Sequence, residues 1–286
     1  MIKLRTKMYR AYLRMRDHPA KLRFVRLFEK FCIPDRGLVF PVLDDIRLLL
    51  HPRDEVEYQI IKGQPYEPWT FQFLEDNLTS DMVTVFAGVN IGLHLIFAAT
   101  RLGSNGVAIG IEPQPWSLCR TRSNLLLNHV TGQVRLVAGA IGPTEALIEM
   151  QAAPENNSGW ASLVIRPKDS HPYQVAMMTL DHALNQLGAK RPDLMLLDVE
   201  GYELEVLKGI SDQCLPRVLI VEAHPVVLKL VSQTFGGFVK CLKERGYAVY
   251  DLKGAAPGET CIENNLICVL KGNPDPRWPT KMKQFH

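Results

Sequence analysis

Two segments of this sequence place glycine and polar residues directly after largely apolar runs of strand length. The segment 86–92, Phe-Ala-Gly-Val-Asn-Ile-Gly, follows the run 82–85 and precedes the helical pattern 93–99. The segment 198–203, Asp-Val-Glu-Gly-Tyr-Glu, follows a second apolar run, 194–197. Glycines between a strand and a helix let the backbone approach a ligand at the helix N-terminus. We therefore expect both segments at the carboxyl edge of a parallel sheet, where they outline a cofactor pocket.

A carboxylate follows the first glycine turn at the spacing found in nucleoside-binding sites. Glu112 closes the apolar run 107–111, and a spacing of about twenty residues lets a carboxylate accept hydrogen bonds from both hydroxyls of a ribose. Pro113 holds Glu112 extended, which weakens the alternative of a surface carboxylate at a helix start. A nicotinamide dinucleotide is disfavoured, because the segment 88–92 lacks the three-glycine spacing that admits a pyrophosphate. The sequence predicts a nucleoside cofactor.

From about residue 81 onward, strand-like runs alternate with helical patterns. This alternation is typical of an α/β fold in which a mostly parallel sheet is covered by helices on both faces. The last two strands, joined by a connection rich in glycine and proline, are expected to form an antiparallel hairpin. We predict strands at 82–86, 106–111, 133–138, 192–197, 217–222, 247–251 and 264–270, with helices at 91–101, 115–129 and 226–244.

Residues 1–80 read as an N-terminal extension with helices and strands. Its first 30 residues carry ten Lys or Arg against two acidic residues. We interpret this basic stretch as a cap helix with its charged face in water. The alternatives are an anionic surface contact, with lipid or nucleic acid, and a presequence, which the scarcity of serine disfavours. The extension is predicted to hold a helix at 1–35, a hairpin at 38–40 and 46–50, and a helix at 68–78.

The stretch 143–178 is longer than an ordinary connection and rich in proline, asparagine and glycine. Loops of this size inside a domain are usually functional or disordered. Because it falls on the way to the ligand-binding edge of the sheet, we interpret it as a substrate lid with one hairpin, within a domain spanning 81–286. A structural insertion is the alternative. Trp160 in this stretch, like Trp69 before it, is a candidate to stack on an adenine or a sugar.

Composition indicates a globular chain. The 286 residues are 47% hydrophobic, yet no run approaches the length of a membrane span, and the N-terminus lacks the pattern of a secretory signal. The six cysteines include no Cys-x-x-Cys pair, which suits reduced thiols and a cytoplasmic protein without disulfide or zinc.

Several short motifs carry a resemblance to a known family. They lie at 88–94, 111–113, 124 with 127–128, 138–142, 179–181, 197–203 and 207–209. Over residues 66–222 the sequence resembles the S-adenosylmethionine-dependent methyltransferases of the FkbM type. The resemblance implies the seven-stranded, Rossmann-like class I methyltransferase sheet. It also implies an enzyme that usually methylates a hydroxyl oxygen of a sugar, a polyketide or a similar small molecule.

The resemblance also suggests which residues contact S-adenosyl-L-methionine. These are Glu67, Gly88, Asn90, Gly92, Glu112, Ala140 and Asp198. Two positions depart from the family pattern: Phe86 stands where an aspartate is usual, and Leu196 where a lysine is favoured. We expect the missing aspartate to weaken cofactor binding about tenfold or more. A binding protein without catalysis is therefore the alternative function.

Three residues are candidates for catalysis. Asp198 ends a predicted strand near the expected methyl group, Glu200 follows it, and His94 lies one turn into the first core helix. The structural alternatives are a helix-capping aspartate, a solvated turn glutamate and a core histidine. Glu203 is expected on the helix surface. A divalent metal on Asp198, Glu222 and His224 is conceivable on two strand ends, but their spacing does not demand it, and we predict no metal site.

Overall fold

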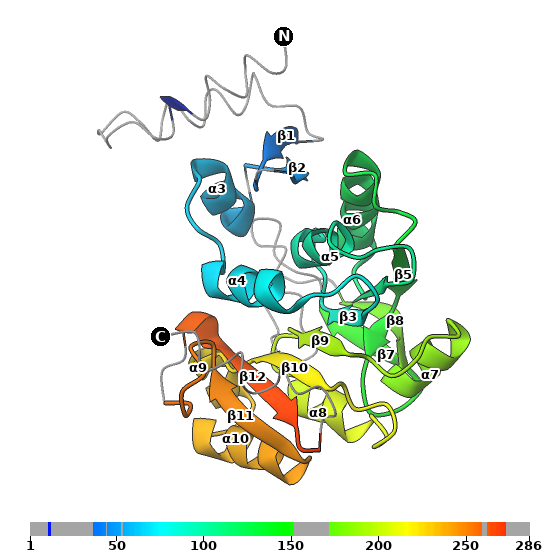
Figure 1. Ribbon diagram of the computed structural model, residues 1–286, viewed down its shortest axis with the longest axis vertical. Helices are drawn as coiled ribbons and strands as arrows, with labels where there is room; N and C mark the ends of the chain where they lie inside the picture. Colours follow the sequence, from blue (N-terminus) through cyan, green and yellow to red (C-terminus); the bar gives the residue numbers. More distant parts are fainter. Residues whose placement is uncertain are drawn as a thin grey trace.

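A computed structural model describes residues 11–12, 37–43, 45–52, 54–151, 172–258 and 262–272. Its centre is a seven-stranded sheet in the order β11-β12-β10-β9-β3-β4-β5 (Figure 1). Strand β12 runs antiparallel to both of its neighbours, and the other described pairings of this sheet are parallel. The strands are β3 (Val83–Ala87), β4 (Val107–Glu112), β5 (Val134–Ala138), β9 (Leu194–Leu197), β10 (Val218–Glu222), β11 (Tyr247–Asp251) and β12 (Asn265–Leu270). The predicted sheet, including its terminal antiparallel hairpin, is confirmed.

Helices cover both faces of this sheet, so the molecule has three layers. The layers follow from the strand period of two, because successive side chains of β3 and β9 enter opposite cores. Phe86 and Leu196 belong to one apolar cluster, and Val85 and Met195 to the other. The first cluster packs on α5 (Leu93–Ala99) and α6 (Pro115–Leu127), and the second on α7 (Leu180–Gln186), α8 (Glu203–Lys208), α9 (Pro225–Leu230) and α10 (Phe235–Glu244).

The N-terminal extension contributes to the first of these cores. Its hairpin, β1 (Leu38–Pro41) and β2 (Arg47–Leu50), has the predicted antiparallel pairing. It is followed by α3 (Glu55–Lys62), which sequence patterns had not indicated, and by α4 (Pro68–Asn77). Phe40, Leu48 and Phe73 are fully buried against the sheet. The predicted helix at 1–35 lies almost wholly outside the described residues.

A polar face of α6 holds the extension in place. Arg120 forms a buried ion pair with Glu57 of α3. One turn on, Asn124 accepts a hydrogen bond from Leu49 N at 2.7 Å and donates one to Ile91 O at 2.9 Å. A further turn on, Asn128 accepts from Arg47 N at 2.9 Å and donates back to Arg47 O at 2.6 Å. Residues four apart share a helix face, so α6 pairs with the β2 backbone much as a neighbouring strand would.

A small second sheet flanks the carboxyl edge of β4 and β5. Its order is β6-β8-β7, with β6 (Ala140–Ile141), β7 (Ala146–Gln151) and β8 (Pro172–Met178). Strands β7 and β8 pair antiparallel, so the stretch 143–178 does contain a hairpin. Residues 152–171, with Trp160, lie outside the described part, and the lid role stays a prediction.

One helix prediction was wrong. The pattern at 226–244 predicted a continuous helix, whereas α9 ends at Leu230 and α10 begins at Phe235. Ser232 adopts a positive φ of 57°, and the Thr234 hydroxyl accepts from Gly237 N at 3.1 Å as a new N-cap. Gly236 and Gly237 are weak helix formers, so starting a new helix at a capping residue costs less free energy than continuing the first helix through them.

The four described cysteines are free thiols: Cys119, Cys214, Cys241 and Cys268. Among the helices in the described ranges, none combines the length and hydrophobicity that crossing a membrane requires.

Replacing Asn124 by alanine should lower the free energy of unfolding by about 1–3 kcal/mol, because Leu49 N and Ile91 O lose their partner where water is scarce. Urea denaturation provides the measurement. The matched control is S123A on the exposed face of the same helix, which should change stability by less than about 0.5 kcal/mol. Equal stabilities of N124A and S123A would show that α6 does not anchor the extension.

Candidate functional site

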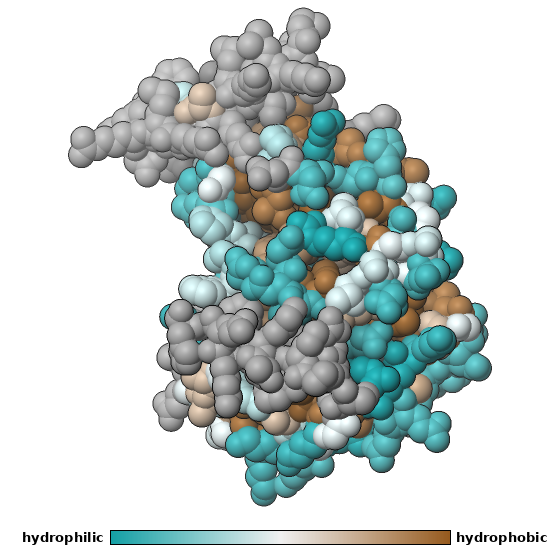
Figure 2. Space-filling view, in the orientation of Figure 1, coloured by the Kyte–Doolittle hydropathy of each residue, from teal (hydrophilic) through white to brown (hydrophobic). Residues whose placement is uncertain are grey.

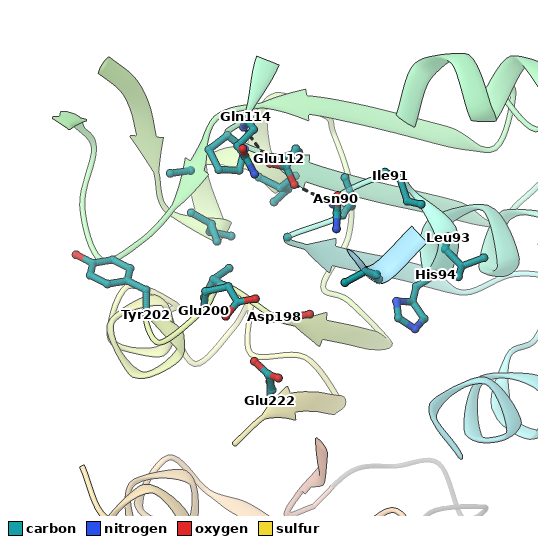
Figure 3. A pocket seen from close by; sticks show the side chains of 18 of the residues that line it. Asn90, Ile91, Leu93, His94, Glu112, Gln114, Asp198, Glu200, Tyr202 and Glu222 are labelled. Carbon is teal, nitrogen blue, oxygen red and sulfur yellow. Dashed lines mark hydrogen bonds between the residues drawn. The ribbon is translucent and has the colours of Figure 1, made fainter. Parts of the chain in front are cut away.

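A pocket of about 190 Å³ opens at the carboxyl ends of β3, β4, β9 and β10 (Figure 3). Its walls combine the glycine turn after β3, the end of β4, the segment after β9, and the start of α4. Most residues singled out from the sequence meet here: Glu67, Gly88, Asn90, His94, Glu112, Ala140, Asp198 and Glu200 line the pocket. Gly92 does not belong to its lining.

The glycine turn is shaped by two close approaches. A Cβ on Gly88, at φ 84°, would lie 1.8 Å from the Asp198 carbonyl oxygen, so only glycine lets the ends of β3 and β9 meet. A Cβ on Gly92 would lie 2.8 Å from Thr121 Cγ2 of α6. Gly92 therefore serves the packing of α5 on α6, and its contact with a cofactor stays a prediction.

Glu112 is buried at the end of β4, and both of its carboxylate oxygens are positioned by backbone amides. One oxygen accepts from Asn90 N at 2.9 Å and the other from Gln114 N at 2.9 Å. Burial raises the pKa of Glu112 to about 7, although these hydrogen bonds lower it in part. Each oxygen keeps a lone pair for a further donor. Glu112 is therefore a preorganised acceptor of two hydroxyl groups.

Three carboxylates gather on the opposite wall. Asp198, Glu200 and Glu222 each bring an oxygen within 4.8 Å of the others, from the ends of β9 and β10 (Figure 3). Burial is the main cause that raises the pKa of each group: that of Asp198 to about 7, that of Glu200 to about 8 and that of Glu222 to about 11. Repulsion adds to burial, from Glu67 and Glu203 in the case of Asp198, and chiefly from Asp198 in the case of Glu200 and Glu222. The raised pKa values favour protonation of the cluster at neutral pH. A bound cation would instead stabilise the ionised carboxylates.

The structure changes the predicted roles of two neighbours. His224 is not part of this cluster, because its Nδ1 accepts from Val226 N at 3.2 Å and caps α9. Glu203 was expected on a helix surface but is buried, and its Oε1 accepts from Val199 N and Gly201 N at 3.1 Å each. Glu203 thus shapes the turn that aims Asp198 and Glu200 into the pocket.

His94 and Glu67 form an ion pair at the other end of the pocket. His94 Nε2 lies 3.4 Å from Glu67 Oε2, and the imidazole stacks on Phe71 with centroids 4.7 Å apart. Burial lowers the pKa of His94, but the carboxylates around it, Glu67 foremost, raise it to above its usual 6.5. In turn, burial raises the pKa of Glu67, but His94 foremost, with hydrogen bonds from its neighbours, brings that pKa below its usual range.

The position of Glu67 is imposed by the C-terminal hairpin. Glu67 has a strained φ of 42° at the start of α4 and does not cap that helix. The cap comes from Glu263 in the 3₁₀ turn η2 (Ile262–Asn264), which accepts from Trp69 N at 2.7 Å and Thr70 N at 2.9 Å. Asn265 Nδ2 donates to Glu67 Oε2 at 3.2 Å. Neither Glu263 nor Asn265 carries a local sequence signal for this role.

Two aromatic residues lie away from the pocket. Trp69 is 38% exposed, with Lys253 Nζ 5.2 Å from its ring centroid, and it lies outside the pocket lining, so its stacking role stays a prediction. Phe86 is buried in the sheet's first apolar layer, where it is the direct cross-strand partner of Leu196. The phenyl ring therefore leaves the space between Glu112 and Asp198 open.

Comparison with known proteins shows a family match over the middle of the chain. The family described as "Methyltransferase FkbM domain" matches residues 87–249. Methyltransferase sdnD of Sordaria araneosa is 26% identical over 208 residues, which cover 62% of this chain and 78% of that protein. The 31-O-demethyl-FK506 methyltransferase FkbM of Streptomyces tacrolimicus is 24% identical over 191 residues, covering 57% and 71%.

Among solved structures, a methyltransferase FkbM from Methylobacillus flagellatus KT superposes with a TM-score of 0.44 at 14% identity. The superposition covers 74% of this chain and 52% of that one, so this chain spans about half the length of that relative.

Replacing Glu263 by alanine should destabilise the protein by about 1–2 kcal/mol, because the first amides of α4 lose their cap. Hydrogen exchange at the Trp69 and Thr70 amides should accelerate beyond that at the sheet. E244A, which removes a surface partner of Lys240 on α10, is the control and should alter neither quantity. Unchanged exchange at Trp69 and Thr70 in E263A would contradict the assigned cap.

Proposed function

The chain belongs to the methyltransferase FkbM domain family, and on this premise we propose that it is an S-adenosylmethionine-dependent O-methyltransferase. The acceptor is a hydroxyl group of a small molecule or saccharide. The observation that carries the proposal is the buried carboxylate of Glu112 beside the glycine turn, with Asp198 across the same pocket. These are the groups that a nucleoside donor and a nearby reacting centre require.

The residues present suit S-adenosylmethionine at both of its polar ends. The two oxygens of Glu112 are held apart by Asn90 N and Gln114 N, so each can accept one ribose hydroxyl. The carboxylates of Asp198, Glu200 and Glu222 complement positive charge, and the cofactor carries both an ammonium and a sulfonium group. When bound, the cofactor supplies an activated methyl group on sulfur. The protein's part is to align the acceptor hydroxyl and remove its proton.

The two departures from the family pattern lie next to each other in the structure. Phe86 and Leu196 face each other across β3 and β9 and lie in the same apolar layer. At these positions the FkbM pattern usually has an aspartate and a lysine, so a pair of opposite charges is replaced here by two apolar side chains. Replacing a buried ion pair by apolar residues as a pair is often neutral for stability. The carboxylates of Asp198 and Glu222 remain to meet the cofactor's ammonium.

His94 is the general base in this proposal, and Glu67 positions it. The carboxylate beside Nε2 favours a proton on that nitrogen and leaves Nδ1 to take the proton of the acceptor hydroxyl. Because Glu67 raises the pKa of His94, the neutral, basic form is reached only above the usual histidine range. Catalysis should therefore rise with pH through the neutral region.

S-adenosylhomocysteine binding, followed by calorimetry, tests the donor assignment. The wild-type protein should bind it, and E112Q should bind about tenfold or more weakly because the charge-assisted hydrogen bonds to ribose are lost. Hydroxyl donors favour the carboxylate over the carboxylic acid, and the pKa of Glu112 in the ligand-free protein is about 7. Affinity should therefore rise as the pH increases from about 6 to 8, by at most tenfold per unit.

In E112Q this pH dependence should be reduced. The control is E149Q, a change of an exposed glutamate on β7 outside the pocket lining, which should behave as wild type. Absence of binding at millimolar ligand would refute the proposed function. An E112Q profile as steep as that of wild type would assign the pH dependence to other groups.

The pKa of the His94 imidazole, measured by NMR titration, should fall in E67Q because the neighbouring negative charge is removed. E145Q is a matched control: Glu145 lies 2.6 Å from His182, and its loss should leave the titration of His94 unchanged. An unaltered His94 pKa in E67Q would show that Glu67 does not tune the base.

A further inference from the structure

A second cavity, of about 390 Å³, adjoins the pocket described above. The two share three wall residues, Ile60, Tyr66 and Leu93. Apolar side chains dominate the new cavity, among them Val42, Leu43, Phe71 and Phe97. In the space-filling view, apolar residues gather between α3 and α5, above α4 (Figure 2).

The candidate base lies at the junction of the two cavities. His94 lines the first pocket, and Phe71, on which its ring stacks at 4.7 Å, lines the second. The Tyr66 ring, common to both, has its centroid 6.2 Å from that of His94. Ile60, Tyr66 and Leu93 thus form the boundary across which a molecule seated in the second cavity would bring a hydroxyl group to the imidazole.

This cavity is built mainly by parts of the chain outside the family match. The match begins at residue 87, whereas Val42 and Leu43 come from the turn after β1, and Gln64 and Pro65 from the connection between α3 and α4. Specificity on a shared fold commonly resides in such added segments. The extension thus supplies a wall that the family domain alone does not provide.

The chemistry of the lining excludes some occupants. The described lining contains no lysine or arginine. Arg101, which stacks on the lining residue Phe97, is already paired with a carboxylate, so it is no free counter-charge for an anionic group. Its one acid, Glu75, is already paired with Arg101. Gln64 and Gln72 are exposed polar residues of the wall. Such a cavity favours an uncharged aliphatic or aromatic group.

We propose that this second cavity binds the apolar body of the methyl acceptor, which makes the acceptor an amphiphilic alcohol or glycoside with an uncharged apolar part. The proposal rests on the proposed function, because it assumes that the first pocket holds the methyl donor. The acceptor's hydroxyl group then extends past Tyr66 to His94, while the apolar part stays between α3, α4 and α5.

The test uses methyl, butyl and hexyl β-D-glucoside as probes, titrated into the full chain in the presence of S-adenosylhomocysteine. Affinity should increase about fourfold for each methylene group that is buried. The heat capacity change of binding should become more negative with chain length. Equal affinities for the methyl and hexyl compounds would overturn the proposal.

A blocking variant locates the effect. Gln64 lines the cavity from an exposed position, so Q64W adds bulk there without opening the core. In Q64W, hexyl glucoside should bind no better than methyl glucoside, while affinity for S-adenosylhomocysteine stays unchanged. Q186W, at an exposed site on α7 outside both cavities, is the matched control and should keep the wild-type dependence on chain length.

The outcomes separate the two proposals. Binding of S-adenosylhomocysteine without a chain-length effect would overturn only the acceptor cavity. A chain-length effect that Q64W abolishes, without any binding of S-adenosylhomocysteine, would overturn the donor assignment and keep the cavity as an apolar binding site. A chain-length effect that survives in Q64W would place the alkyl group elsewhere and refute the cavity's role.

Discussion

The close approach of β3 and β9 at their carboxyl ends is the constraint on which the site depends. Gly88 has no room for a side chain beside the Asp198 carbonyl, and Asp198 N donates to Ala87 O at 3.0 Å. Both polar turns therefore start from one point. Because they diverge from there, the turn that positions Glu112 and the turn that carries Asp198 and Glu200 face the same space. A bulkier residue at position 88 would separate the two walls of the pocket.

Segments outside the residues that match the family complete the site. His94, Glu112 and Asp198 lie within the residues that match the family, but Glu67 and the groups that hold it do not. Glu67 depends on a helix cap and an amide that come from residues 263 and 265, almost two hundred positions later in the chain. The polar face of α6 adds a third constraint by fixing β2 and α3. The proposed base, His94, and the residue proposed to orient it, Glu67, are thus supplied by different parts of the protein.

Sequence patterns predicted those features that arise locally. The parallel sheet was predicted from its apolar runs. The glycine turn, Glu112 and Asp198 were predicted because each follows or ends such a run with a polar or flexible residue. The missed features depend on contacts that form only in the folded structure. Gly92 faces Thr121, Glu203 folds back on its own turn, and Glu263 reaches α4 from another element. The break between α9 and α10 was missed because the periodicity continues across it while the cap at Thr234 depends on a single hydroxyl.

The facing pair of Phe86 and Leu196 has a consequence for how such a chain can change over generations. In either direction between the apolar pair and an aspartate with a lysine, the first substitution leaves one charge unmatched inside an apolar layer. Removing one partner of a buried pair typically costs about 3–5 kcal/mol, a large part of the stability of an ordinary domain. The two positions are therefore energetically coupled, because a charge at one is tolerated only when the other carries its opposite.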